Sequence, residues 1–293
     1  MLDWQTLSTS GLTDYTLSGA TNYLCAGTIN FYGTTRIQGG AVVKFAPSPA
    51  AALLKFFGPV ICETDMHHPA YFVSKFDATV GETMDDNTTP ASYAGAFELT
   101  TTGNKLKHLR VRNASVAVKG WDIDVRHSQF TACNTVFYMP ESGAGSGPCR
   151  LGNVLVANSG YIFSGTYYNV IATHLTVNNC YGALTSDPYN RSSASFINSL
   201  LVNIDSMGVI PSPTLTASHV LPSTPAKFQT VGGGSHYLVP GSPYRSAGVP
   251  TIDATLLAEL KQTTTYPPPE RGRVPQSWWH RRTRARLRAV RHA

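Results

Sequence analysis

Five short stretches of this chain align with one another without a gap. They begin at residues 109, 128, 154, 175 and 200, so successive starts lie 19 to 26 residues apart. The third position is Val or Phe in every stretch: Val111, Phe130, Val156, Val177 and Val202. The tenth position is Val, Phe or Leu throughout. A repeat of this length, built from β-branched and aromatic residues, predicts a solenoid of stacked coils.

Alternation within the stretches predicts that each one is a strand with one inward face. In Leu109-x-Val111 and Leu175-x-Val177, every second side chain is apolar, which matches the period of a strand. Equivalent strands of neighbouring coils then pair in parallel, roughly 4.8 Å apart. The fifth position carries three asparagines, which predicts a broken asparagine ladder at a turn: Asn113, Ala132, Asn158, Asn179 and Ile204.

A second apolar column supports two inward strands in each coil. It lies three residues before each stretch: Leu106, Val125, Leu151, Ala172 and Ile197. With these columns, with GGAVVKF at 39–45 and with the segment 242–267, the chain resembles the right-handed parallel β-helix proteins of the pectate-lyase-like superfamily. The resemblance covers about residues 20–267. It implies an all-β, right-handed parallel β-helix with a short C-terminal capping helix, and no catalytic motif of the superfamily is matched.

The relatives implied by segment 242–267 are large β-helix proteins of environmental bacteria, many of them secreted. The resemblance therefore implies an extracellular or cell-surface location. The first residues, MLDWQTLSTS, lack the basic and apolar regions of a signal peptide. A mature form and a fragment of a longer protein both remain open. No run of 18 apolar residues is present, so no membrane span is expected.

Four parts are expected along the chain. Residues 1–20 form a lead-in or cap, 21–210 the coils, 211–267 a turn-rich closing segment with a short amphipathic helix at 252–262, and 268–293 a basic tail. Residues 270–293 hold eight Arg and one acid, a charge of +7, so the remainder carries −1 of the total +6. This charge argues against specific nucleic-acid binding by the body. The tail is expected either to contact polyanions or to be an extension without a role.

The segment WDIDVRH, residues 121–127, is the best candidate for chemistry. If it is a strand, Asp122, Asp124 and Arg126 share its outward face. The repeat alignment places basic residues on neighbouring coils beside this acid pair: Lys105, Lys107 and Arg150. In β-helix enzymes, outer faces of this kind hold polysaccharide, as the resemblance implies.

Three interpretations of this charged column are open. Two outward carboxylates on one strand are separated by a distance compatible with glycoside hydrolysis. Alternatively, Asp122 and Asp124 bind a calcium ion, while Arg126, Lys105 or Lys107 acts on a uronic acid, as in a polysaccharide lyase. The third interpretation is a ladder of salt bridges that relieves repulsion between coils. An open groove would favour an enzyme, whereas fully paired charges would favour a scaffold.

Further candidates lie on other positions of the coils. Arg150 and a set of tyrosines are candidate substrate-binding residues, because tyrosine rings stack on sugars: Tyr161, Tyr167, Tyr168 and Tyr181. The residues one position before each stretch form a polar column: His108, His127, Asn153, His174 and Ser199. This column predicts either a site for metal binding or proton transfer, or a polar ladder without a ligand. The acidic segment 63–90 reads either as a cation site or as a plain loop: Asp65, His67, His68, Asp77, Glu82, Asp85 and Asp86.

These observations leave three functions open. The first is binding of an extended polysaccharide along the outer face of the solenoid. The second is a polysaccharide-cleaving enzyme, a lyase or a glycoside hydrolase, that uses the charged column. The third is a structural segment of a larger surface protein. A fold resemblance alone does not decide among them.

Overall fold

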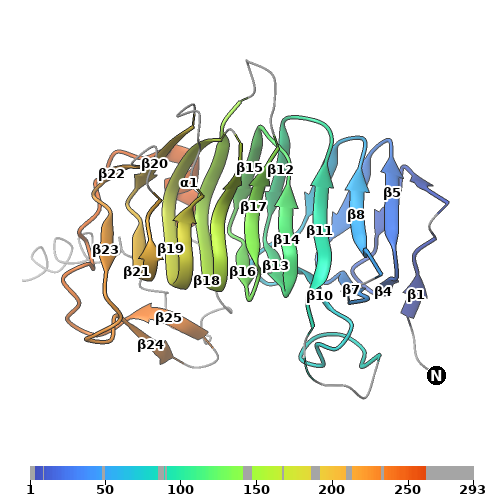
Figure 1. Cartoon of the computed structure of the whole chain (residues 1–293), viewed down its shortest axis with the longest axis horizontal. Coiled ribbons are helices and arrows are strands. Elements are labelled where there is room, and N and C mark those ends of the chain that lie inside the picture. Colours follow the sequence, from blue (N-terminus) through green and yellow to red (C-terminus); the bar gives the residue numbers. More distant parts are fainter. Residues whose placement is uncertain are drawn as a thin grey trace, which may run out of the picture.

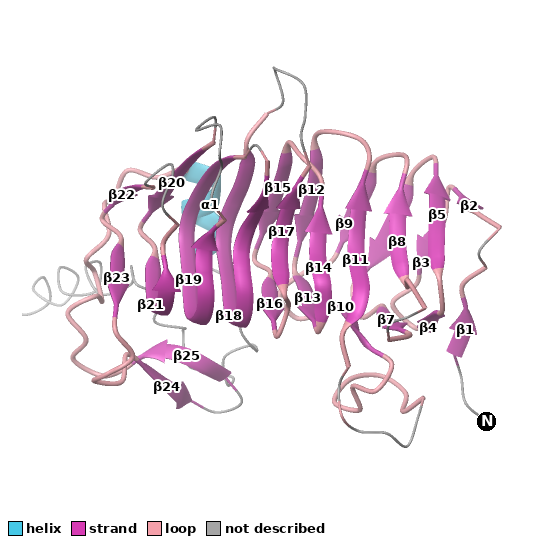
Figure 2. Ribbon diagram, in the orientation of Figure 1, coloured by secondary structure: helices cyan, strands magenta, loops and turns pink. Residues whose placement is uncertain are grey.

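The computed structural model of the chain is an elongated right-handed solenoid of parallel strands (Figure 1). It describes residues 4–8, 10–47, 50–84, 89, 91–140, 147–166, 168–185, 192–208, 213–231 and 234–261. A sheet of 23 strands winds through this part of the chain. From β1 to β17 each strand pairs with the strand three positions further on or with its equivalent segment in the long strand β18, and near the end β20 pairs with β22 and β21 with β23. The all-β, parallel β-helix prediction is confirmed (Figure 2).

Three strands per coil give the solenoid three flat faces, each named here after one strand of a central coil. The β12 face contains β3 (Thr16–Leu17), β6 (Thr35–Gln38), β9 (Val60–Glu63), β12 (Asn104–Lys107), β15 (Ile123–Arg126), β20 (Ser193–Ile197) and β22 (Thr214–Thr216). The β13 face contains β1 (Trp4–Thr6), β4 (Asn22–Cys25), β7 (Val42–Phe45), β10 (Ala70–Ser74), β13 (Leu109–Arg112), β16 (Gln129–Thr131), β21 (Leu200–Ser206) and β23 (His219–Leu221).

The third, or β14, face contains β2 (Leu12–Thr13), β5 (Thr28–Tyr32), β8 (Leu53–Phe56), β11 (Tyr93–Leu99), β14 (Ala114–Lys119) and β17 (Thr135–Met139). Two long strands, β18 (Cys149–Gly165) and β19 (Asn169–Leu184), turn through all three faces. Pairing begins at β1, where Trp4 lies opposite Asn22, so coils already form within the expected lead-in. It continues to β23, beyond residue 210.

Inward side chains from the three faces form one continuous apolar core. Aromatic rings of successive coils stack inside it, as in Phe31 on Phe56 at 5.0 Å and Phe137 on Phe163 at 5.4 Å between ring centroids. The five aligned stretches supply much of this core, and the first four pair in the predicted register. Like residues thus stack on like residues, because a parallel coil repeats the same position about every 4.8 Å.

Two corners of each central coil are formed by single residues in the left-handed conformation. At the corner between the β13 and β14 faces, φ is 50° to 63° at Asn113, Ala132, Asn158, Asn179 and Asn203. Asparagine tolerates this conformation better than most residues. Nδ2 of Asn179 donates to Oδ1 of Asn158 at 2.8 Å, and Nδ2 of Asn203 donates to Oδ1 of Asn179 at 2.9 Å. The predicted asparagine ladder is present.

The fifth stretch begins at Ser199, one residue earlier than predicted. Val177 lies opposite Leu201 and not Val202, and Ala172 lies opposite Phe196 and not Ile197. The asparagine column therefore continues with Asn203 and not Ile204. The run Leu200-Leu201-Val202 is apolar at every position, so hydrophobicity alone fits either register. The left-handed residues Asn198 and Asn203 fix the correct one.

The chain after the last coil folds back along the side of the solenoid. A two-stranded antiparallel hairpin, β24 (Phe228–Val231) and β25 (Gly234–Leu238), packs on the β13 face. The predicted helix is α1 (Ala254–Leu260), capped by the Asp253 side chain, which accepts from the backbone N–H of Leu256 at 2.9 Å. It lies on the side of the stack, where Leu256 packs beside Gly152 of β18, and not over its end. No helix of the described residues is long and apolar enough to cross a membrane.

Candidate functional site

The charged column on the β12 face has the predicted order. Lys105 lies opposite Asp124, and Asp124 lies opposite Arg150 on the next coil. Lys107 lies opposite Arg126. Asp122, however, precedes β15 in a left-handed turn with φ of 50°, and its carboxylate lies against Gly147. It is therefore not part of the outward face of the strand, and no carboxylate pair of one strand forms there.

Helix α1 lies over this column and engages its charges. Arg126 Nε donates to both carboxylate oxygens of Asp124, at 3.1 and 3.2 Å, and its Nη1 donates to Glu259 at 3.2 Å. The ring Nε2 of His127 hydrogen bonds to the same Glu259 oxygen at 3.0 Å. Gly152 leaves room for the buried Leu256 beside these groups. The charges at Asp124 and Arg126 thus hold the helix on the solenoid.

Replacing Glu259 by alanine is expected to lower the free energy of unfolding by about 1–3 kcal/mol, because the nearly buried His127 loses the acceptor of its ring N–H. Urea unfolding at pH 7 measures the change. Asp253→Ala removes only the longer 4.0 Å contact to Arg126 and the helix cap, and should cost about 1 kcal/mol. Equal losses in the two variants would contradict the Glu259 contact.

The other candidate sugar-contacting residues are dispersed. Arg150 is exposed on the β12 face. Tyr168 is fully buried, so its ring cannot meet a ligand without a change in the coil. Tyr161 and the exposed Tyr181 lie on adjacent coils of the β14 face, with ring centroids 5.2 Å apart in an edge-to-face arrangement. Tyr167 lies outside the described residues.

The histidine column is a polar ladder at the corner between the β12 and β13 faces. Rings of His108 and His127 stack at 5.0 Å, and Nδ2 of Asn153 donates to Nδ1 of His127 at 2.9 Å. The column continues with Asn198, not with Ser199, in line with the corrected register. Burial lowers the pKa of His174 to about 4.

In the acidic segment, side chains bond within the chain. The Asp65 carboxylate accepts from the backbone N–H groups of His67 and His68. Asp77 accepts from Thr79 and Arg112. Asp85 and Asp86 lie outside the described residues. Within the parts of the chain that the structure covers, no three His, Cys, Asp or Glu side chains gather to hold a metal ion.

A different site emerges on the β13 face, which the sequence analysis did not consider. Two outward columns of side chains run along this face, and the polarity of each column changes along the solenoid. One reads Val42, Tyr71, Arg110, Gln129, Leu155, Thr176 and Leu200; the other reads Lys44, Val73, Arg112, Thr131, Ala157, Asn178 and Val202. Both columns are mostly apolar and buried near the ends and polar in the middle.

Added segments cover the two ends of the columns. The 75–84 loop lies over β7, where the fully buried Lys44 donates to the Asp77 carbonyl at 2.7 Å. The β24–β25 hairpin lies over β21, where Leu238 packs on Leu200 and Val202. Figure 1 shows both covers on the same side of the solenoid. Between them lies a small groove, in which Gln129, Leu155 and Ala157 are each 6% exposed or less.

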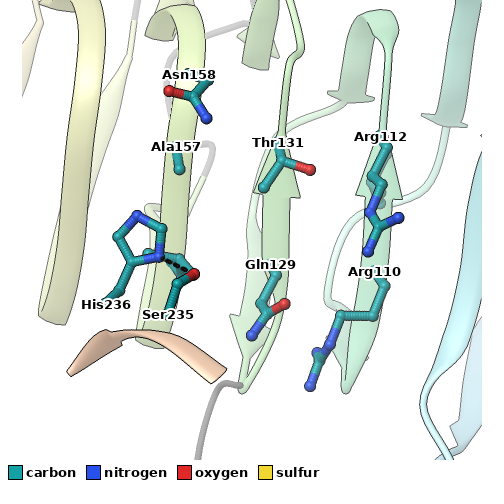
Figure 3. Close-up of a pocket in the computed structure, with 10 residues that line it drawn as sticks. Arg110, Arg112, Gln129, Thr131, Ala157, Asn158, Ser235 and His236 are labelled. Carbon is teal, nitrogen blue, oxygen red and sulfur yellow. Dashed lines mark hydrogen bonds between the residues drawn. The ribbon is translucent and has the colours of Figure 1, made fainter. Parts of the chain in front are cut away.

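This groove, here called the β13 groove, is a pocket of about 220 Å³. Figure 3 shows side chains of three successive coils and of the hairpin around it. Its lining carries two guanidinium groups, amides, hydroxyls and an imidazole, and it includes no carboxylate: Arg110, Val111, Arg112, Gln129, Thr131, Leu155, Ala157, Asn158, Ser235 and His236.

The Gln129 side chain lies at the centre of the β13 groove, and its amide nitrogen has no hydrogen-bond partner among the described residues. The residue is 6% exposed, and its Nε2 is buried. A buried unsatisfied N–H group costs about 1–3 kcal/mol. Native proteins rarely retain a buried polar group without a hydrogen-bond partner. An acceptor atom of a bound ligand is a partner that satisfies such a group.

The chain matches no family model, no curated protein and no solved structure in the three comparisons made.

Two arginines of the neighbouring strand, Arg110 and Arg112, line the β13 groove beside the Gln129 amide and have different environments. Arg110, opposite Gln129, is 7% exposed, and its Nη1 donates to the carbonyls of Leu109 and His127. Arg112 is 34% exposed at its side chain and donates through Nη1 to Thr79 at 2.8 Å and to Asp77 at 3.4 Å. A guanidinium carries five N–H donors, so these contacts position Arg112 without using its full capacity.

The hairpin contributes an oriented hydroxyl at the other edge of the β13 groove. Nδ2 of Asn178 lies 3.1 Å from Nε2 of His236 and must donate to it, because an amide nitrogen cannot accept. Nδ1 of His236 then carries the proton and donates to the Ser235 oxygen at 2.9 Å (Figure 3). Burial lowers the pKa of His236, which keeps the ring neutral at pH 7. The Ser235 oxygen therefore accepts from His236, and the Ser235 hydroxyl hydrogen points away from the His236 ring.

Proposed function

We propose that this protein binds an acidic polysaccharide through the β13 groove. The observation that carries the proposal is the buried, unpartnered amide of Gln129 opposite Arg110, with Arg112 two residues further along the same strand as Arg110. A carboxylate oxygen is an acceptor that satisfies such an amide, and it is attracted by both guanidinium groups. Charge-assisted hydrogen bonds of this kind are the stronger class.

The composition of the β13 groove supports a sugar acid over other anions. Thr131, Asn158 and Ser235 offer the hydroxyl and amide groups that meet sugar hydroxyls. The volume of about 220 Å³ is below the roughly 300–1,000 Å³ of pockets for drug-sized molecules, which suits a single sugar ring.

Binding is favoured over catalysis by the state of the β12 column. Arg126 is bonded to Asp124 and to Glu259 of α1, and paired charges at this column favour a scaffold. Catalysis or calcium binding by Asp122 and Asp124 with Lys105 or Lys107 stays a prediction. The charge of −1 on residues 1–269 and the lack of Phe, Tyr and Trp in the described lining of the groove both argue against nucleic acid.

Gln129→Leu is expected to weaken saccharide binding while leaving the protein as stable as before, or more stable. Leucine is similar in size and removes the unsatisfied amide, so the buried polar group no longer costs free energy. Loss of a hydrogen bond to a charged group corresponds to about a tenfold to hundredfold loss of affinity. Titration calorimetry with oligogalacturonate and urea unfolding measure the two effects.

A matched charge control separates the groove from the rest of the surface. Arg112→Gln removes a cation from the groove and should weaken oligogalacturonate binding at least tenfold. Arg150→Gln makes the same change on the β12 face and should leave binding within twofold. Equal losses would indicate general charge attraction, and an effect confined to Arg150→Gln would move the site to the β12 column. A neutral oligogalactoside should not bind the wild type detectably.

A further inference from the structure

The two covers that bound the β13 groove also limit what can occupy it. We infer that the β13 groove holds only a short stretch of acidic saccharide, and that a polymer does not extend along the solenoid axis. This inference rests on the proposed function, because it concerns the length and path of the same ligand. It differs from the expectation that a polymer follows the outer face of the solenoid.

The first wall is the 75–84 loop, which is fixed on the β13 face by buried contacts. Lys44 Nζ donates to the Asp77 carbonyl, and the carboxylate of Asp77, 3% exposed, accepts from Thr79 and Arg112. Further along, the Glu82 backbone N–H donates to Asn22 at 3.2 Å. The loop therefore blocks the β13 face from β4 to β7 and reaches Arg112 on β13.

The second wall is the β24–β25 hairpin. Leu238 packs on Leu200 and Val202 of β21, and Phe228 and Leu221 pack against the same small cluster. The His236 ring contacts Asn178 on β19. The hairpin therefore closes the β13 face from β19 to β21, and Ser235 with His236 forms the edge that faces the groove.

Few coils remain between the walls. The pocket between them is lined by β13, β16, β18 and the hairpin, and Gln129, Leu155 and Ala157 within it are each 6% exposed or less. Two inter-strand steps of about 4.8 Å amount to roughly 10 Å along the axis. The volume of about 220 Å³ suits a single sugar ring, so one residue of a chain fits between the walls. A longer chain must leave the groove across the strands.

The experiment is a length series with the wild-type protein. Defined oligogalacturonates of two to eight residues are titrated by calorimetry at one pH and one salt concentration, and affinities are corrected for the number of overlapping binding positions. The expected result is a corrected affinity that changes less than twofold from two to eight residues, because one residue occupies the pocket. No variant is needed, so a folding defect cannot affect the outcome.

Two other outcomes are informative and distinct. A corrected affinity that keeps rising through eight residues would overturn the length limit, because the chain would then continue past a wall, while the proposed function would stand. No binding at any length would refute the proposed function itself. The Gln129→Leu variant is titrated with the trimer and with the octamer. If both ligands lose affinity by the same factor, both bind in the β13 groove.

Discussion

Acidification from pH 6.5 to pH 4 is expected to reduce the free energy of unfolding by about 3 kcal/mol for each of two buried histidines. Burial lowers the pKa of His108 and of His174 to about 4, and the positive neighbours of His108 add to the effect. In the unfolded chain, both titrate near 6.5. Between these values the unfolded chain takes up protons that the folded protein does not bind, so stability falls as the pH falls.

The control for this prediction comes from the ladder itself. Asn153 and Asn198 occupy the same corner in other coils with φ of 54° and 51°, close to 51° at His108 and 56° at His174. The variant His108→Asn/His174→Asn keeps the left-handed corners and removes both titrating groups. Urea unfolding from pH 7 to pH 4 should show a much flatter profile for the variant. Parallel profiles for the two proteins would contradict the assignment.

Phe137→Ala is expected to destabilise the solenoid by about 3–5 kcal/mol, the range for loss of a fully buried phenylalanine. The ring is completely buried, stacks on Phe163 with centroids 5.4 Å apart and meets Phe130 edge-on at 5.0 Å. Both neighbours lie in rigid strands, so the cavity cannot close easily. Chemical unfolding followed by tryptophan fluorescence or circular dichroism measures the loss.

Phe57→Ala makes the same deletion at the surface. Phe57 is 40% exposed, stacks on Tyr32 at 5.0 Å and lies near the Lys55 ammonium. Its removal should cost about 1 kcal/mol, because half of the ring already contacts water and only one stacked pair is lost. Comparable losses in the two variants would contradict the larger contribution assigned to the buried Phe137 ring.

The repeat predicted the fold well because a solenoid places the same requirement on every coil. Val111, Phe130, Val156 and Val177 occupy one inward column in the predicted register. The prediction was wrong where the pattern carried no information, at Leu200-Leu201-Val202, where a shift by one residue leaves every inward position apolar. The corner residues Asn198 and Asn203 contained the missing signal, because the left-handed conformation recurs at fixed places in each coil.

The β13 groove was not predictable in the same way. Its walls come from segments outside the repeat, the 75–84 loop and the β24–β25 hairpin, whose docking positions follow from tertiary packing and not from local pattern. One sequence signal was present. Along the outward columns, apolar residues such as Val42 and Leu200 flank the polar Arg110 and Gln129, and an outward apolar residue in a solenoid indicates that something covers it.

The β12 column illustrates the opposite case. Its residues lie in the predicted order, yet the sequence did not show that Glu259, far along the chain, reaches Arg126 and His127. Hydrogen bonds with both partners hold the pKa of Glu259 below its usual range, although burial acts to raise it. A charged cluster read from sequence is therefore a candidate site only until the elements that cover it are known.

The most direct test of the account is a crystal structure of the protein soaked with trigalacturonate. The account predicts a sugar carboxylate within hydrogen-bond distance of Gln129 Nε2, with Arg110 and Arg112 beside it and the Ser235 hydroxyl at the edge of the ligand. A trisaccharide bound instead along Lys105, Asp124 and Arg150 would contradict it, and so would an empty β13 groove at a ligand concentration that saturates binding in solution.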